Sequence, residues 1–261
     1  MKKHWLWYAI LFIFVIGIIA FVIGFNNAVS IGVEVTQPVP VSPVETDPDA
    51  QPEIVPAGAY RVAVIGDSLA QGTGDPAGDG FVGRVVREME LQLSLPVELY
   101  NFAIEGLRSE ELVEQIENPL MIQGMAHARY IIVSIGGNNL RAIRNVPAGQ
   151  QRQMFEDQLT LYLTHLDSIL DKIRNANEEG LIIFLGLYNL DYLGSEQENA
   201  MLIEWNYETH QLLETYHQTL FIPTYDLFQL NLDRYLSFDR VHPNSLGHEA
   251  IAERIIVNLF E

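Results

Sequence analysis

Residues 60–69 read Tyr-Arg-Val-Ala-Val-Ile-Gly-Asp-Ser-Leu, and this stretch decides the fold. Its apolar part, Arg61–Ile65, is short and almost continuous, which is typical of a strand covered on both faces in a parallel sheet. Gly66, Asp67 and Ser68 then end the run, and glycine followed by small polar residues is typical of a tight turn. The stretch therefore predicts a buried strand that leads into a turn carrying a serine.

Four more short apolar runs follow along the chain: Val97–Phe102, Tyr130–Ile135, Leu181–Leu187 and Leu220–Ile222. Amphipathic helices are predicted between them, with one apolar face formed by Phe81, Val82, Val85, Val86 and Met89, and a later one by Phe155, Leu159, Tyr162, Leu163, Leu166, Ile169 and Leu170. A last helix is expected from about Ser245 to Leu259, capped by Asn244 or Ser245. Five strands interleaved with helices predict an α/β fold, a three-layer α/β/α sandwich around a five-stranded parallel sheet of the flavodoxin-like type.

A different kind of sequence precedes this region. Trp5–Phe25 contains no charged residue, and as a helix it would span roughly 31 Å, the thickness of a bilayer core. Lys2 and Lys3 precede the run, and no further Lys or Arg occurs before Arg61. The positive-inside rule therefore predicts a cytoplasmic N-terminus, a single-pass anchor within residues 1–25, and a cell-membrane protein whose remaining residues are extracellular.

The alternative to an anchor is secretion after signal cleavage, since Ala28-Val29-Ser30 offers a small-x-small pattern. Residues 26–59 hold six of the twelve prolines and five acidic residues without a basic one, which predicts a disordered linker. Residues 60–261 are then the folded domain.

Charge and cysteine content exclude several function classes. The 261-residue chain has 34 acidic and 15 basic side chains, a net charge of −19, of which −16 belongs to residues 60–261. Nucleic acid is therefore excluded as a partner, because phosphate binding needs clustered Lys and Arg. Cysteine is absent, which excludes disulfides, thiolate metal sites and cysteine nucleophiles.

The residues expected at the carboxyl edge of the sheet fit acyl transfer by serine. Ser68 on a strand-to-helix turn can present its hydroxyl, His242 is a suitable base, and Asp239 lies three residues before it. Asp239 is therefore close enough to accept a hydrogen bond from the imidazole. Gly106 can bring a backbone N–H close to a ligand, and the Asn138 amide is a side-chain donor of the kind found in oxyanion holes.

These residues resemble the SGNH hydrolases, the GDSL-type esterase and lipase family, over roughly residues 60–261. Ser68 matches the nucleophile of the GDS block, and Asp239 and His242 match the D-x-x-H block. The resemblance implies an oxyanion hole formed by the N–H groups of Ser68 and Gly106 and by the Asn138 side chain.

One position departs from the family pattern. Asn139 stands where the family often has aspartate after the block asparagine. A neutral amide replaces a carboxylate beside the oxyanion donor, which changes the contacts available to support it.

Two competing interpretations use the same residues. Gly66-x-Ser68-x-Ala70 approximates the nucleophile elbow of α/β-hydrolases, but there the serine follows several strands, whereas here only about eight folded residues precede it. The other is a cell-surface binding or scaffolding domain that keeps the fold and has lost catalysis.

The resemblance implies a serine ester hydrolase that needs no cofactor or metal and acts on a small-acyl, lipid or O-acetyl-glycan ester, and we expect a monomer. The stretch Leu187–Glu198, with Tyr188, Asp191 and Tyr192, is expected to line the substrate pocket. His210, His217 and His248 are interpreted as surface or partly buried residues, and Gly72-Thr73-Gly74 as a flexible loop after the nucleophile.

Overall fold

The computed structural model describes Phe14, residues 60–189 and residues 196–260, except for the side chains of residues 145 and 148. Apart from Phe14, these residues belong to one compact unit within Val55–Glu261. The predicted anchor, except for Phe14, and the predicted linker lie outside the described residues. Among the helices of the described part, none is long and apolar enough to cross a bilayer.

A five-stranded sheet forms the centre of this unit. Its strands are β1 (Tyr60–Gly66), β2 (Val97–Asn101), β3 (Tyr130–Ser134), β4 (Leu181–Leu185) and β5 (Thr219–Ile222), in the order β2-β1-β3-β4-β5. Every pairing is parallel; Val64, for example, is in register with Asn101 of β2 and with Ile132 of β3. The predicted five-stranded parallel sheet is confirmed, and each strand begins and ends within two residues of its predicted bounds.

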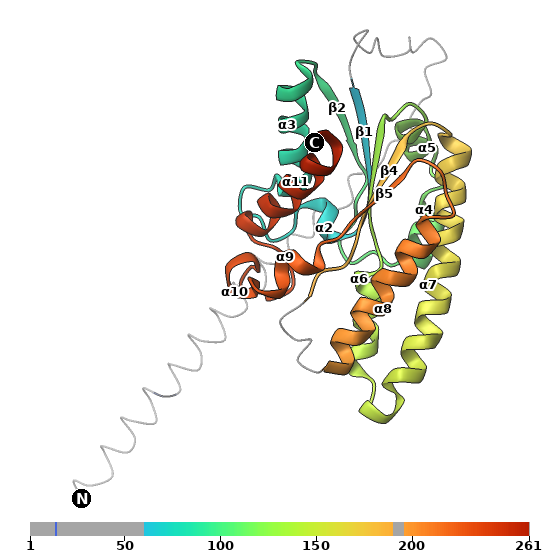
Figure 1. The fold of residues 1–261 in the computed structure, drawn as a ribbon, viewed down its shortest axis with the longest axis vertical. Helices are drawn as coiled ribbons and strands as arrows, with labels where there is room; N and C mark the ends of the chain where they lie inside the picture. Colours follow the sequence, from blue (N-terminus) through green and yellow to red (C-terminus); the bar gives the residue numbers. More distant parts are fainter. Residues whose placement is uncertain (1–13, 15–59, 190–195, 261) are drawn as a thin grey trace, which may run out of the picture. The chain divides into compact units, whose positions relative to one another are not determined.

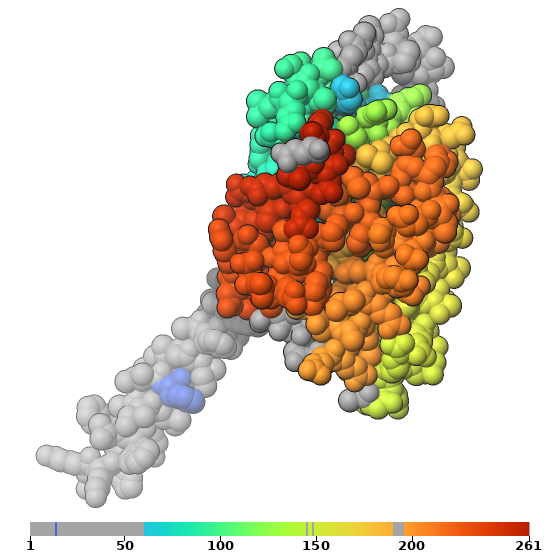
Figure 2. All heavy atoms as spheres, in the orientation of Figure 1, coloured from blue at the N-terminus to red at the C-terminus, as the bar shows by residue number. Residues whose placement is uncertain are grey.

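Helices follow each strand: α2 (Ser68–Gln71) and α3 (Gly80–Leu93) after β1; α4 (Ser109–Gln115) and α5 (Pro119–Ala126) after β2; α6 (Gly137–Arg141), a 3-10 turn (Ala142–Asn145) and α7 (Ala148–Ala176) after β3; α8 (Glu196–Leu213) after β4; and α9 (Tyr225–Gln229), α10 (Leu232–Tyr235) and α11 (Ser245–Phe260) after β5. Figure 1 shows α3 and α11 on one side of the sheet and α4, α5, α7 and α8 on the other. Figure 2 shows α8 to α11, in orange and red, forming much of the visible face.

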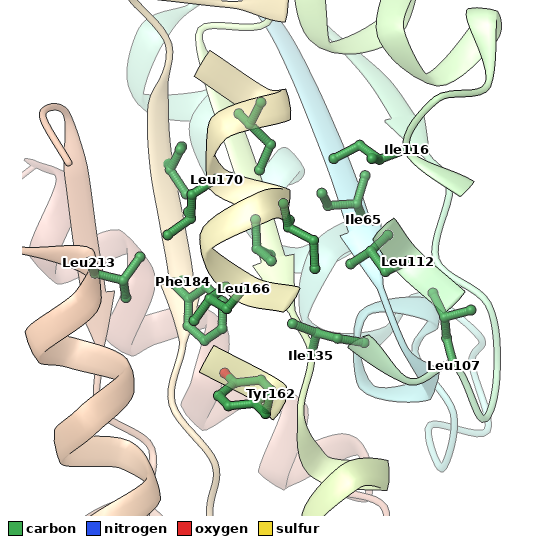
Figure 3. Packing of buried hydrophobic residues seen from close by; sticks show 14 of the residues in the cluster. Ile65, Leu107, Leu112, Ile116, Ile135, Tyr162, Leu166, Leu170, Phe184 and Leu213 are labelled. Carbon is green, nitrogen blue, oxygen red and sulfur yellow. The ribbon is translucent and has the colours of Figure 1, made fainter. Parts of the chain in front are cut away.

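Both faces of the sheet are buried, which explains the continuous apolar runs. Alternate residues point to opposite faces of a strand. Ala63 and Ile65 pack with α4, α5, α7 and α8, whereas Val62 and Val64 pack with α3 and α11. Figure 3 shows the first cluster, in which Ile65 and Phe184 of the sheet lie among side chains of α4 and α7. The edge strand β2 is the exception, because its residues are only partly buried or exposed.

Strand order places a topological switch point between β1 and β3. The chain leaves β1 for β2 on one side and then crosses to β3 on the other, so the segments that follow β1 and β3 diverge at the carboxyl edge of the sheet. Ligand sites of open parallel sheets form at such a point. The turn carrying Ser68 and the loop carrying Asn138 therefore flank the same crevice.

Candidate active site

The turn after β1 is built to hold Ser68 at the sheet edge. Gly66 has φ +136°, and a Cβ there would lie 1.9 Å from the Ser134 carbonyl oxygen, so only glycine allows this approach to β3. Asp67 caps α2, because its Oδ1 accepts from the N–H of Leu69 at 3.1 Å. Ser68 is the first residue of that helix and is 8% exposed. The nucleophile candidate is thus fixed by the central strand and by its neighbour.

The structure brings the three residues of the predicted triad together. His242 Nε2 lies 2.8 Å from Ser68 Oγ, and His242 Nδ1 lies 2.6 Å from Asp239 Oδ2. A carboxylate only accepts, so Nδ1 carries the proton and Nε2 is the acceptor that faces the serine hydroxyl. A serine hydroxyl bonded to an imidazole that a carboxylate orients is the arrangement used for acyl transfer.

Asp239 is held by its own turn. Its Oδ1 accepts from the N–H groups of Val241 and His242 at 2.8 and 2.9 Å, and from Ser237 Oγ at 2.7 Å. Burial raises the pKa of Asp239, but the hydrogen bonds from His242, the two backbone amides and Ser237 outweigh it and lower the pKa below its usual value. The carboxylate is therefore ionised wherever the imidazole works as a base.

Two of the three predicted oxyanion donors line one cavity. Ser68 and Asn138 both line the cavity that contains His242, and the N–H of Ser68 lies in the first turn of α2, where amides have no intrahelical acceptor. Gly106 is outside the lining; it lies on the neighbouring loop at φ +79° and is exposed. Asn138 joins the two loops, because its Nδ2 donates to the Leu107 carbonyl at 3.0 Å.

The cavity beside the serine has about 100 Å³ of space and a largely apolar wall. Its apolar lining residues are Leu69, Leu140, Ile143, Leu187, Met201, Leu202 and Val241. Arg141, Arg144, Gln151 and Glu198 add polar groups. Of the stretch predicted to line the pocket, Leu187, Tyr188 and Glu198 do so, whereas Asp191 and Tyr192 lie outside the described residues.

Asp67 does more than cap α2. It is 6% exposed, lines the cavity and accepts from Ser134 Oγ at 3.1 Å. Burial raises the pKa of Asp67 to about 6, against the lowering effect of the Ser134 and Leu69 hydrogen bonds and of His242. A Gly-Asp-Ser motif shows no sign of this burial, because the atoms that cover Asp67 come from distant segments.

The interpretation of His248 as a surface or partly buried residue is wrong. His248 is fully buried on α11, where Nδ1 accepts from the N–H of Phe81 and Nε2 donates to the Thr73 carbonyl, both at 3.1 Å. Burial lowers the pKa of His248 and keeps it neutral. His210 and His217 are partly buried and exposed, as predicted; His210 pairs with Glu214 at 3.1 Å.

The loop after the nucleophile is packed in place, which corrects the expectation of a flexible Gly72-Thr73-Gly74. A Cβ on Gly74 would lie 2.3 Å from the Pro243 carbonyl oxygen. Asp75 accepts from Arg84 and from Ser245 Oγ, both at 2.6 Å. These contacts fasten the loop that follows Ser68 to the start of α11, directly after His242.

Comparison with known proteins agrees with this geometry. Residues 64–250 match the model of the GDSL-like Lipase/Acylhydrolase family. The spore germination lipase LipC of Bacillus licheniformis is 31% identical over 201 residues, which cover 75% of this chain and 94% of that protein.

Solved structures share the fold. The lipase Lip_vut3 from a goat rumen metagenome has a TM-score of 0.68 and 28% identity, covering 77% of this chain and 98% of its own. Axe2, an acetylxylan esterase from Geobacillus stearothermophilus, has a TM-score of 0.61 at 20% identity, covering 78% and 96%. The chain belongs to the GDSL-like lipase/acylhydrolase family and is a serine ester hydrolase.

Proposed function

We propose that Ser68 is the nucleophile of this esterase, that His242 is its general base and acid, and that Asp239 orients His242. The observation that carries the proposal is the unbroken relay from Ser68 Oγ to His242 Nε2 at 2.8 Å and from His242 Nδ1 to Asp239 at 2.6 Å. The N–H groups of Ser68 and Gly106 and the Asn138 amide are proposed to bind the oxyanion.

The reaction follows from these positions. Ser68 Oγ attacks the ester carbonyl while its proton passes to His242 Nε2, and the oxyanion donors stabilise the tetrahedral intermediate. The intermediate collapses, the bond to the alcohol breaks, and the imidazolium returns the proton to the leaving oxygen. Water then attacks the acyl-serine by the same route, which releases the carboxylic acid and restores the hydroxyl.

The cavity wall supports an aliphatic ester as the substrate. Leu140, Ile143 and Met201 offer apolar contact beside Ser68, and such a wall favours an alkyl chain over a hydroxylated sugar. We therefore rank a lipid or medium-chain acyl ester above an O-acetyl glycan. The relatives include a lipase by name and an acetylxylan esterase, so both substrate classes belong in the assay.

Placement outside the cell, on a membrane anchor, is part of the proposal. It is supported by Lys2 and Lys3 before the uncharged run Trp5–Phe25 and by the proline-rich residues 26–59. Mass spectrometry of the mature N-terminus, combined with protease treatment of intact cells, tests it. An intact N-terminus on a protease-accessible domain fits the anchor; a cleaved N-terminus in the medium fits secretion, and a domain protected in intact cells contradicts both.

The catalytic assignment is tested by Ser68→Ala. Without the nucleophile, kcat on p-nitrophenyl esters is expected to fall by about 10⁴-fold or more, with loss of labelling by a fluorophosphonate. Ser168→Ala, a matched serine change on α7, is the control and should keep both. A Ser68→Ala protein that hydrolyses at the parental rate would refute the assignment, and a folded parent that takes no label would favour the binding-domain alternative.

The substrate assignment is tested by Met201→Phe. A larger side chain reduces the space for the acyl chain, so kcat/KM for an octanoyl ester is expected to fall roughly tenfold relative to an acetyl ester. Acyl esters of increasing length, with acetylated xylan beside them, provide the measurement. Unchanged chain-length preference would show that the acyl chain binds elsewhere.

A further inference from the structure

Two neighbouring asparagines connect the loop after β3 to the loop that carries Gly106. Asn138 Nδ2 donates to the Leu107 carbonyl at 3.0 Å. Asn139 is 4% exposed; its Oδ1 accepts from the N–H of Ser109 at 3.0 Å and its Nδ2 donates to Glu110 Oε2 at 2.8 Å. The segment just after Gly106 therefore depends on both asparagines for its position.

Asn139 lies between a group that only donates and a group that only accepts. The N–H of Ser109 can only donate, to Asn139 Oδ1, and the Glu110 carboxylate can only accept, from Asn139 Nδ2. An amide supplies both and can be oriented in only one way here, whereas an ionised aspartate supplies only acceptors. This requirement gives a physical reason for asparagine at a position where related enzymes often carry aspartate.

Glu110 is held as a carboxylate by its surroundings. Burial raises its pKa, but its own N–H, the Asn139 amide, Arg108 and His165 outweigh this and lower the pKa below its usual value. Arg108 lies 3.8 Å away and His165 Nδ1 lies 4.0 Å away. His165 Nδ1 also lies 3.1 Å from Ser109 Oγ, which ties α7 to the same segment.

We propose that Asn139 and Glu110 form a matched pair that positions the oxyanion loop, so that position 139 must be an amide as long as position 110 is a carboxylate. Both are positioning residues, because they act through the segment that carries Gly106 and Leu107. The inference rests on the proposed function, since it concerns the oxyanion hole of that reaction.

Asn139→Asp tests the pair by placing a second carboxylate against Glu110. At pH 8, kcat is expected to fall roughly 10- to 100-fold with little change in KM, because the loop can no longer hold its donor in place. The new carboxyl group can donate only when protonated, beside Glu110, Arg108 and His165. The activity of the variant relative to the parent should therefore rise as pH is lowered.

Asn139→Asp combined with Glu110→Gln provides the rescue. The double variant exchanges amide and carboxylate, so the hydrogen bond is restored in the opposite direction, and kcat should return to within about threefold of the parent. Glu110→Gln alone keeps an acceptor for the Asn139 amide and should also stay within about threefold. If Asn139 contributed only to stability, the variants would differ in Tm, but kcat per active site would show neither the rescue nor the pH dependence.

Asn177→Asp is the matched control. Asn177 is also buried, and its Nδ2 donates to the Met125 and Ala128 carbonyls at 2.7 Å, at the opposite edge of the sheet. It should lower Tm while leaving kcat per folded enzyme unchanged.

Fluorophosphonate titration counts folded active sites in each variant. The proposal that Asn139 and Glu110 form a matched pair is overturned if Asn139→Asp keeps the kcat of the parent at pH 8, or if the double variant is no more active than Asn139→Asp. Should the single variant not fold, recovered folding and activity in the double variant supports the proposal, and a double variant that also stays unfolded overturns it. These outcomes are independent of Ser68→Ala, whose failure would remove the proposed function itself.

Discussion

The two halves of the proposed catalytic relay, Ser68 on one side and Asp239 with His242 on the other, are held by different means. Ser68 stands at the end of the central strand β1, 8% exposed, above a glycine that touches the backbone of β3. Asp239 and His242 stand on a surface turn, with side chains 34% and 15% exposed, next to Phe238, which is 98% exposed. The proposed nucleophile is positioned by the core, whereas the proposed base is positioned by hydrogen bonds within its own turn.

This difference shows that rigidity can come from two sources in one site. Ser68 is fixed by burial against a parallel sheet and by hydrogen bonds that its turn makes with β3, from the N–H of Asp67 to the Ser134 carbonyl at 2.9 Å and from Ser134 Oγ to Asp67 at 3.1 Å. The base, with little core around it, is instead fixed by four hydrogen bonds to Asp239, from Ser237, Val241 and His242. Changes on the base side should therefore affect catalysis most, and changes beneath the serine should affect stability.

The largest effect is expected on the base side, from Asp239→Asn. The amide would keep an acceptor for the backbone amides but present a donor to His242 Nδ1, which selects the wrong tautomer, and kcat should fall by about 10⁴-fold. Asp233→Asn is the control, because Asp233 is 93% exposed at its side chain and pairs with Arg240 at 2.7 Å, away from the imidazole. Unchanged activity in Asp239→Asn would show that another group orients the imidazole. The contrast between a serine held by the core and a histidine held by hydrogen bonds of its own turn would then no longer stand.

On the serine side, Asp67→Asn is expected to change how the stability of the protein depends on pH. The folded-state pKa of Asp67 is raised, so its contribution to stability is fully present below pH 3.8 and is lost as pH rises through about 6. The asparagine variant escapes this loss and should be more stable than the parent at pH 8 by an amount on the order of 3 kcal/mol.

Thermal unfolding from pH 4 to pH 8 measures this change. Asp75→Asn is a control of opposite sign, since hydrogen bonds from Arg84 and Ser245 outweigh burial and lower the pKa of Asp75, and its loss should destabilise the protein at pH 8. If the Tm of the parent and that of Asp67→Asn changed with pH in parallel, the argument that burial raises the pKa of Asp67 would be contradicted.

The smallest effect is expected from His248→Leu, which removes two of the hydrogen bonds that join α11 to the segment following Ser68. The buried N–H of Phe81 and the partly buried carbonyl of Thr73 would lose their partner, so the free energy of unfolding should fall by about 2 kcal/mol. His217→Leu, on the surface, should be close to neutral.

The effect of His248→Leu should also depend on pH. Because the pKa of His248 is lowered in the folded state, its contribution is present above about pH 6.5 and lost as pH falls below it. The stability gap between the parent and the leucine variant should therefore narrow below pH 6.5. A constant gap would mean that His248 does not titrate as argued.

The sequence predicts what depends on local pattern. Short apolar runs such as Tyr130–Ile135 indicated buried strands because both sheet faces are covered. Residue type limited the cap of the last helix to Asn244 or Ser245, and the structure shows Asn244, whose Oδ1 accepts from the N–H groups of Leu246 and Gly247. The association of Ser68 with His242 followed from the motifs, since each lies on a segment that the fold brings to the same edge of the sheet.

Contacts between distant side chains were not predictable in this way. His248 is buried by Phe81 and Thr73, more than 160 residues earlier, and no helical pattern around it indicates that. The role proposed for Asn139 depends on Glu110 being a carboxylate 29 residues away, which the sequence around either residue does not indicate. The partial exposure of β2 likewise depends on its place at the edge of the sheet.

The separation of 174 residues between Ser68 and His242 has a consequence for biosynthesis. During translation the turn bearing the Ser68 hydroxyl is made long before the turn that carries its proposed proton acceptor, His242. A nascent or truncated polypeptide that ends before Asp239 holds the proposed nucleophile without its base, so we expect ester cleavage only once the turn of Asp239 and His242 has been made and α11 has docked beside α3 (Figure 1).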